Sequence, residues 1–397
     1  MSDPNPTACR RSARRARLSL GAIVFAAFAL TAPVGALAQA QLPPSLELRV
    51  PVAPTVATGD GASFVAYELH ITNFSPAPLN LRRVEVVSSI TNGSVLLALS
   101  DSLLYRALGR PGVSPAPQLA ERAVVGAGLR AVVFLWVPVN GTPPPDRLRH
   151  RVSVSQRTAD SASIHLVEGE TVSVKTEVAL IGPPLRGGGW LAGNGPGPLT
   201  GHRRALIPVD GIPAIAQRFA IDYVKLNDTG STLAGDRALN ENYLAEGVDA
   251  IAVADGVVAL TKDGIPENVP GINSRAVPIT LETVGGNFVI IDIGRDRYAF
   301  YAHLKPGSLR VRPGDRIRRG QVLGLVGNSG NSTEPHLHFH LSDGPSPLGS
   351  RGLPYAIDTF QVEGRCRRML AECTRNTAAE FRRREIPMAN MIVRFPE

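Results

Sequence analysis

Three of the eight histidines in this 397-residue chain lie within five positions, at His336, His338 and His340. Apolar residues alternate with them from Leu337 to Leu341, and a period of two is typical of a β-strand. Residues two apart in a strand point to the same face, so we expect the three imidazoles to share one side. Imidazoles bind divalent metals and carry protons, so the spacing predicts a metal-dependent site, with a solvated polar strand face as the alternative.

Asp222 is the second residue whose surroundings indicate chemistry. It lies inside the apolar run from Gln217 to Val224, where a buried carboxylate is costly unless it is paired or binds a metal. We therefore predict that Asp222 is a metal ligand. The alternative is that Arg218 or backbone amides neutralise it.

The N-terminal segment predicts export. Five arginines and one aspartate fall within residues 1–17, Leu18 to Leu30 is almost wholly apolar, and small-x-small cleavage sites follow around Ala38. This order is typical of a signal peptide, which we assign to residues 1–38. We expect the mature chain to be secreted or periplasmic. We also expect it not to remain inserted in the membrane, because no later stretch is long and apolar enough to span a bilayer.

The charge of the chain favours an anionic partner without requiring one. The net charge is +8, half of it from the predicted signal peptide, and a further arginine cluster lies between Arg365 and Arg384. A mild basic excess suits an anionic polymer surface, and a solvated basic tail is the alternative. We expect no nucleic-acid partner, because the sequence has neither a recognisable nucleic-acid module nor a basic run interleaved with aromatic residues.

Two cysteines, Cys366 and Cys373, remain after the predicted cleavage. An even pair in an oxidising compartment favours a disulfide. Seven residues along an unbroken helix separate Cα atoms by about 10 Å, which is too far for a bridge. A disulfide here therefore requires a bend in the chain between the two residues.

The length of the mature chain predicts two domains, both mainly β. Residues 42–184 alternate short strand patterns with Pro, Gly and Asn turns, which is typical of an immunoglobulin-like β-sandwich. Residues 185–200 are dense in Gly and Pro and are predicted to be a linker. Strand patterns over residues 201–362 predict an antiparallel sheet, including a hairpin from Ala250 to Val258. Residues 363–397 are predicted to be a basic C-terminal tail.

Four short blocks in the second domain carry a resemblance to a known family. They are Tyr301-Ala302-His303-Leu304, Gly314-Asp315 with Gly320-Gln321, Gly327-Asn328-Ser329-Gly330-Asn331-Ser332, and His336-Leu337-His338-Phe339. In order and spacing they resemble the lysostaphin/LytM-type zinc metalloendopeptidases, over Gly201 to Leu348. The resemblance implies a LytM-type peptidase domain that uses Zn²⁺ to hydrolyse peptide bonds in peptidoglycan stem peptides or cross-links. A regulatory protein partner stays open.

The resemblance also implies a role for each matching residue. His338 corresponds to a zinc ligand, and Asp222 corresponds to the carboxylate ligand. His336 corresponds to a catalytic histidine beside the metal, and His303 corresponds to its partner. The first domain lies outside the resemblance, so residues 187–362 are expected to suffice for activity.

One position departs from the family pattern. The first ligand is often a histidine four residues before the aspartate, and here Arg218, which cannot bind zinc, holds that position. We predict that His202 supplies the missing imidazole from the preceding loop. Otherwise the chain is a catalytically degenerate LytM-fold protein that binds the wall or activates another wall hydrolase. His340 replaces a residue that is often Glu in the family, and it is either a partner of His338 or a partly exposed strand histidine.

Overall fold

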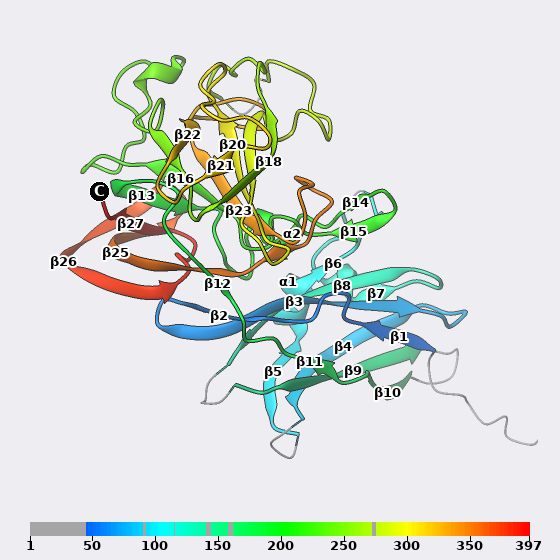
Figure 1. Ribbon diagram of the computed structural model, residues 1–397. Helices are drawn as coiled ribbons and strands as arrows, with labels where there is room; N and C mark the ends of the chain where they lie inside the picture. The colour runs from blue at the N-terminus through cyan, green and yellow to red at the C-terminus, as the bar shows by residue number, and fades with distance from the viewer. Residues whose placement is uncertain (1–44, 90–92, 115, 140–143, 158–161, 272–274) are drawn as a thin grey trace, which may run out of the picture. The chain divides into compact units, whose positions relative to one another are not determined.

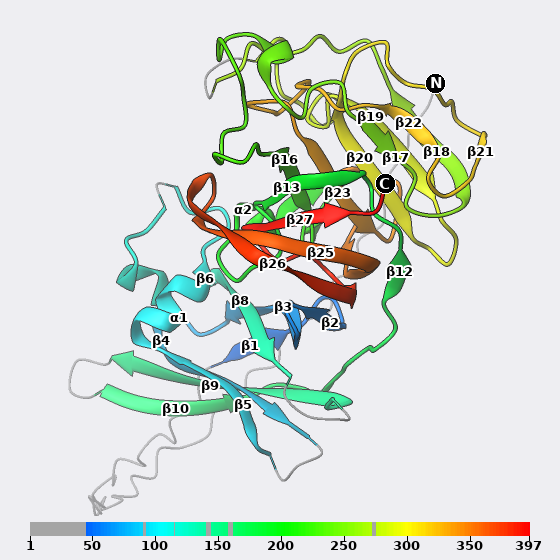
Figure 2. The same cartoon turned by 90° about the vertical axis from the view of Figure 1, so that its left-hand side faces the viewer.

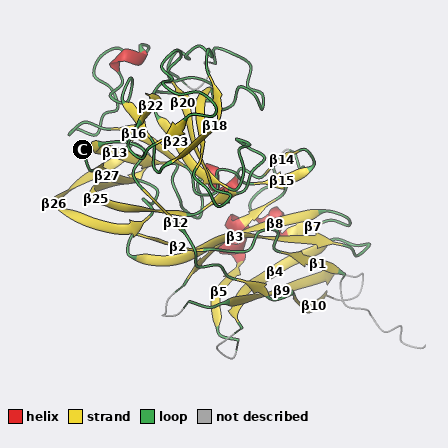
Figure 3. Cartoon of the chain, in the orientation of Figure 1, coloured by secondary structure: helices red, strands yellow, loops and turns green. Residues whose placement is uncertain are grey.

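Strands dominate the fold (Figure 3), which confirms the mainly β prediction. The computed structural model describes residues 45–397 apart from 90–92, 115, 140–143, 158–161 and 272–274. The predicted signal peptide, residues 1–38, lies outside the described residues. Within the described part of the chain, no helix combines the length and apolarity that crossing a membrane requires.

Two antiparallel sheets form the N-terminal domain (Figure 1). The first contains β1 (Leu46–Arg49), β2 (Val56–Gly59), β3 (Ala62–Asn73), β6 (Leu108–Gly109) and β8 (Arg130–Pro138). The second contains β4 (Leu79–Ser88), β5 (Val95–Ser100), β7 (Val124–Val125), β9 (Arg147–Arg157), β10 (Ala162–Glu168) and β11 (Val172–Ser173). Buried aliphatic residues of both sheets, such as Leu69 and Val84, share one core. This is a β-sandwich, and its immunoglobulin-like topology stays a prediction.

Two short helical segments pack against this sandwich. They are the α-helix α1 (Asp101–Ala107) and the 3₁₀ turn η1 (Ala120–Ala123). Leu104 of α1 and Ala123 of η1 are buried in the sandwich core.

A twelve-stranded sheet organises the second domain (Figure 2). Its main path runs through β12 (Ala179–Ile181), β25 (Tyr355–Arg368), β27 (Met391–Phe395), β13 (Gly187–Gly193), β16 (Ile221–Lys225), β23 (Leu337–Ser342), β20 (Tyr298–Leu304), β19 (Asn287–Asp292), β18 (Gly256–Lys262) and β21 (Arg316–Ile317). β24 (Gly352–Leu353) pairs with β23, and β26 (Ala371–Glu385) pairs with β25. The neighbours are antiparallel except β12 and β25, which run parallel. The order places β16 and β20 on either side of β23.

Smaller elements complete the second domain. They are β14 (Ile207–Val209) paired with β15 (Ile212–Ala214), β17 (Asp249–Ile251) paired with β22 (Val322–Leu325), the four-residue helix α2 (Gly201–Arg204) and the 3₁₀ turn η2 (Asn240–Asn242). The hairpin predicted over Ala250 to Val258 is wrong, because β17 pairs with β22 whereas β18 pairs with β19 and β21. A bend at residues 253–255 connects the two strands, which belong to different sheets.

The predicted linker over residues 185–200 is wrong for residues 187–193. The glycines from Gly187 to Gly193 lie in β13, which pairs with β27 on one side and β16 on the other, whereas Gly195 and Gly197 follow the strand. A Cβ on Gly189, whose φ is +81°, would meet the Leu226 carbonyl oxygen at 2.6 Å. Glycine therefore allows a close backbone approach here, a role that composition alone cannot separate from that of a flexible linker.

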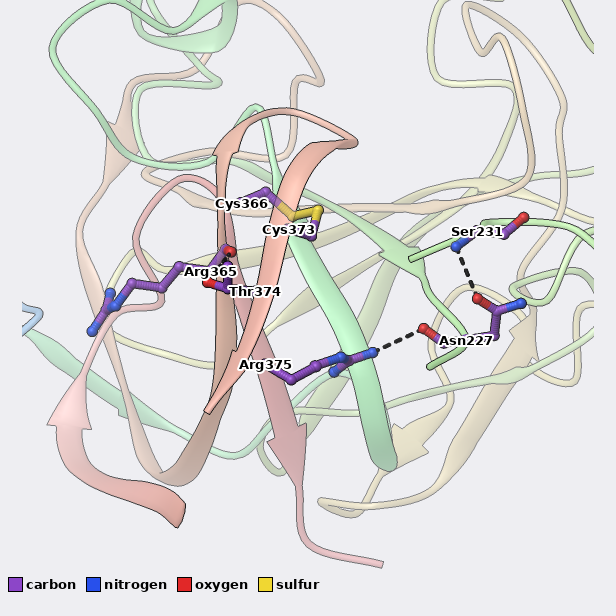
Figure 4. The surroundings of a disulfide bond; sticks show 7 residues. All are labelled: Asn227, Ser231, Arg365, Cys366, Cys373, Thr374 and Arg375. Atoms are coloured by element: carbon purple, nitrogen blue, oxygen red, sulfur yellow. Dashed lines mark hydrogen bonds between the residues drawn. A yellow bond between two sulfur atoms is a disulfide. The ribbon is translucent and has the colours of Figure 1, made fainter. Parts of the chain in front are cut away.

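The predicted tail over residues 363–397 is also wrong, because these residues finish β25 and form β26 and β27. A disulfide joins Cys366 to Cys373, which face each other across β25 and β26 (Figure 4). The disulfide prediction is confirmed, and the required bend is a hairpin turn. Residues 187–362 alone would leave β13 without its β27 neighbour, so the structure argues against that fragment as a self-sufficient unit.

The two domains share buried apolar contacts. Phe64 and Ala66 of β3 belong to the same core as Tyr301 and Phe339 of the large sheet. The chain from Pro43 to Glu397 forms one compact unit. The first domain therefore packs directly against the second through a shared apolar core.

Candidate metal centre

The structure brings all five predicted site residues to one cavity of about 250 Å³. Asp222 lies on β16, His338 lies opposite it on β23, and His336 directly precedes that strand. His303 is the penultimate residue of β20, and His202 is the second residue of α2. Sheet pairing thus fixes the relation of the aspartate to His338, while His202 reaches the cavity from outside the sheet.

Three of these residues could hold one metal ion. His202, Asp222 and His338 offer ligand atoms that all lie within 4.8 Å of one another. His338 Nδ1 is 2.8 Å from Asp222 Oδ1, and His202 Nε2 is 3.3 Å from Asp222 Oδ2. Their roles as ligands stay a prediction, which this geometry makes possible.

The surroundings keep the Asp222 carboxyl ionised. Burial alone would raise its pKa, but the imidazoles of His202 and His336 outweigh burial and hold the pKa well below its usual range. The alternative of neutralisation by Arg218 is wrong, because that guanidinium is paired with Glu68. An ionised carboxylate facing imidazoles is the form that a divalent metal requires of its ligand.

Backbone carbonyls set the tautomers of the two remaining histidines. His303 Nδ1 lies 2.8 Å from the Ser329 carbonyl oxygen, and His336 Nδ1 lies 2.8 Å from that of Glu334. A carbonyl oxygen only accepts, so each Nδ1 carries a proton and donates it. Each Nε2 is left free for chemistry, and the His336 Nε2 lies 3.5 Å from Asp222 Oδ1.

The environment separates the pKa values of these two imidazoles. Burial, followed by the neighbouring His336 and His338, holds the pKa of His303 well below its ordinary value. Burial also acts to lower the pKa of His336, but Asp222 and Glu334 overcome it and raise that pKa above its ordinary value. One imidazole therefore stays neutral while the other takes up a proton readily, a division typical of acid–base pairs.

The backbone at His303 is strained in a way that the sequence did not signal. Its φ is +64°, in the left-handed region that a non-glycine residue occupies at a cost of roughly 1–3 kcal/mol. The His303 amide donates to the Gly285 carbonyl, and the His303 and His336 rings approach to 4.9 Å between centroids. Strain of this kind persists only where surrounding contacts impose it, as these do.

His340 contacts the ring nitrogen of His338 that is not next to Asp222. It is fully buried, and its Nδ1 lies 2.9 Å from His338 Nε2. The alternative of a partly exposed strand histidine is therefore wrong. When His338 Nδ1 serves as a ligand, its Nε2 carries the proton and donates to His340, which fixes the orientation of the ligand ring.

Sequence reasoning missed Asn194, the residue that follows β13. Its Oδ1 accepts from the backbone amides of Gly201 at 3.0 Å and His202 at 3.4 Å, while its Nδ2 donates to Asp222 Oδ2 at 3.4 Å. This one side chain thereby links the start of α2 to the carboxylate. The only signal was an Asn-Gly pair, which predicts a turn and nothing more specific.

Comparison with known proteins gives a family for part of the chain. Residues 243–349 match the model of Peptidase family M23, which confirms the resemblance over that segment. The segment includes His303, His336 and His338, whereas His202 and Asp222 precede it. Arg218 and His202, the two residues that define the departure from the family pattern, therefore lie outside the match.

Two curated relatives and one solved structure are similar over limited lengths. Peptidoglycan DD-endopeptidase ShyA of Vibrio cholerae is 43% identical over 56 residues, which are 14% of this chain and 13% of the relative. Glycyl-glycine endopeptidase ALE-1 of Staphylococcus capitis is 39% identical over 56 residues, 14% of this chain and 15% of the relative. The catalytic domain of lysostaphin from Staphylococcus simulans is 20% identical, with 40% of this chain and 84% of that chain covered at a TM-score of 0.22. The chain thus spans 13 to 15% of the length of these curated relatives.

Proposed function

We propose that this protein, whose residues 243–349 match the model of Peptidase family M23, is a zinc endopeptidase that hydrolyses peptide bonds in peptidoglycan stem peptides or cross-links. The observation that carries the proposal is the convergence of His202, Asp222 and His338 beside the His303–His336 pair in one cavity. The names of the two curated relatives, a peptidoglycan DD-endopeptidase and a glycyl-glycine endopeptidase, support a wall peptide as substrate.

The donor set suits zinc. Two imidazoles and one carboxylate form one of the ligand sets of catalytic zinc sites, which leave a further position for water or substrate. A bound Zn²⁺ would supply Lewis acidity and lower the pKa of water towards 7. His202, Asp222 and His338 would hold the ion, and the adjoining cavity gives a peptide access to it.

The chain itself supplies proton transfer and orientation. His303 presents a neutral Nε2 to the cavity, which can accept a hydrogen bond from the attacking water. The Nε2 of His336, whose pKa is raised, can take up a proton and deliver it to the leaving amine. Phe300 and Val284 line the same cavity and offer an apolar wall for substrate atoms.

A secreted or periplasmic location completes the proposal, since peptidoglycan lies outside the cytoplasm. The charged and apolar pattern of residues 1–38 supports export through a signal peptide. N-terminal sequencing of protein recovered from the cell envelope or medium tests this, and a mature chain that still begins at Met1 would contradict it.

Metal analysis and wall digestion test the function together. The purified full chain should contain one Zn²⁺ and release peptides from purified peptidoglycan; a chelator should stop release and added Zn²⁺ should restore it. His202→Ala is the deciding variant, because full zinc content and full activity in it would eliminate His202 as a ligand. The second candidate, a degenerate wall-binding or activating protein, is favoured by Arg218 at the usual ligand position. It predicts sedimentation with peptidoglycan without zinc and without release.

A further inference from the structure

A buried charge cluster joins the two domains next to the metal centre. Glu68 on β3 accepts from Arg203 on α2 through Oε1. It also accepts from Arg218, with 2.6 Å between Oε2 and Nη2 and 3.2 Å between Oε1 and Nε. All three side chains are at least 96% buried. The two guanidiniums outweigh the effect of burial and lower the pKa of Glu68 to about 2, so the carboxylate is charged.

The remaining contacts of Arg203 also lie in the first domain. Its Nη2 donates to the backbone carbonyls of Tyr67 at 2.6 Å and Leu135 at 3.2 Å. Its guanidinium lies over the Phe134 ring, 5.4 Å from the centroid. The side chain that follows His202 in sequence is therefore held at several points by β3 and β8.

α2 needs such an anchor. It has four residues, about one turn, and its N-cap residue, Thr200, makes no side-chain capping hydrogen bond. A helix of this length does not hold its own conformation, because helix formation has a costly nucleus. Asn194 binds the amides of Gly201 and His202. Arg203 and Arg204 then hold the helix against the first domain, where Arg204 donates to the Arg106 carbonyl and lies over the Phe134 ring.

We propose that Glu68 is a positioning residue for the metal centre: through Arg203 it holds α2 so that His202 faces Asp222, and the first domain thereby completes the site. This inference rests on the proposed zinc function. Arg218 belongs to the same arrangement. It occupies the usual position of the family's first histidine and forms an ion pair with Glu68. The Glu68 carboxylate thus contacts both the residue that follows His202 and the arginine at the usual ligand position.

The test measures Zn²⁺ affinity in the full chain by competition with a chromogenic chelator. Glu68→Gln should weaken Zn²⁺ binding about 10-fold, the lower end of the range found when direct partners of metal ligands are removed, because Glu68 acts through Arg203. Val84→Ala is the matched control, because it opens the core of the same sandwich in the other sheet. It should lower thermal stability and leave Zn²⁺ affinity unchanged.

Glu68→Asp keeps the charge and shortens the side chain, and it serves if Glu68→Gln does not fold. It should show an intermediate loss of affinity. The visible spectrum of the Co²⁺-loaded chain gives a second readout, because its intensity depends on ligand number and geometry. Both Glu68 variants should change it, whereas Val84→Ala should not.

The outcomes separate the inference from the proposed function. If wild-type and Val84→Ala protein bind Zn²⁺ and the folded Glu68 variants bind it equally tightly with the same Co²⁺ spectrum, the positioning role is refuted and the zinc function stands. If wild-type protein binds no Zn²⁺, or His338→Ala binds it as tightly as wild type, both proposals fail. A loss confined to the Glu68 variants supports the inference.

Discussion

The two imidazoles assigned as metal ligands are held in opposite ways. His338 lies on β23, which is hydrogen-bonded to β16 on one side and β20 on the other. His202 lies on a single helical turn. Its buried side-chain anchor, Arg203, donates to Glu68, which lies 135 residues earlier in the chain. One half of the site is therefore built into the sheet, and the other half depends on a junction between domains.

The two ligands should therefore differ in how easily mutations elsewhere displace them. On the strand side, neighbouring strands fix the backbone, and His340 fixes the ring of His338. On the helix side, the geometry of His202 depends on buried charges, whose removal leaves an uncompensated partner. We expect the strand side to tolerate damage to the first domain and the helix side to be sensitive to it.

The largest effect is expected from removal of the ligand on the strand side. His338→Ala should lower Zn²⁺ affinity by more than about 100-fold, beyond the loss that supporting residues cause. Peptide release should become undetectable as a result. Zinc analysis after dialysis and digestion of purified peptidoglycan measure both effects, with His165→Ala on β10 as the control. One tightly bound zinc in His338→Ala would refute its role.

His303→Ala should separate chemistry from metal binding. We expect turnover to fall about 10²- to 10⁴-fold, since a positioned acid–base group is lost. Zinc content should stay at the wild-type level, because His303 is not among the three residues predicted to bind the metal. Comparison of kcat with bound zinc in the same preparation measures this. Unchanged turnover would remove His303 from the mechanism.

Variants of His340 sharpen the account of the strand side. His340→Leu removes the partner of His338 Nε2 and should weaken Zn²⁺ binding about 10-fold or more. His340→Asn places an amide oxygen near the position of Nδ1 and should recover most of the affinity. Chelator competition on both variants distinguishes hydrogen bonding from packing. Equal affinities in the two would show that only packing matters at this position.

A last effect, on folding and not on zinc binding, concerns acid stability on the helix side. The pKa of Glu68 falls from 4.5 to about 2 on folding, so its stabilisation is complete above pH 4.5 and is lost as the pH drops towards 2. The shift corresponds to about 3 kcal/mol in the free energy of unfolding. Urea unfolding with chelator present, from pH 5 to pH 2, should therefore show a shallower loss of stability in Glu68→Gln than in wild type. Parallel curves would mean that Glu68 does not titrate as described.

The sequence by itself predicted the parts of the site that depend on local pattern. The alternation through His338 and His340 is a strand, and Asp222 in its apolar run lies on another. The resemblance to the family predicted the role of His303, and the arginine at position 218 led to the prediction that His202 is the replacement ligand. Each of these inferences uses residues that are close together in the chain or match a known order.

Tertiary structure alone decided how those residues are supported. The glycines of β13 and the arginines of β26 carry no local signal that separates a sheet strand from a linker or a tail. The Glu68–Arg203 contact and the positive φ of His303 likewise arise from segments that meet only after folding. Sequence pattern reports the faces and periods of single elements, whereas the pairing of distant elements and of buried charges is set by the free energy of the whole packed chain.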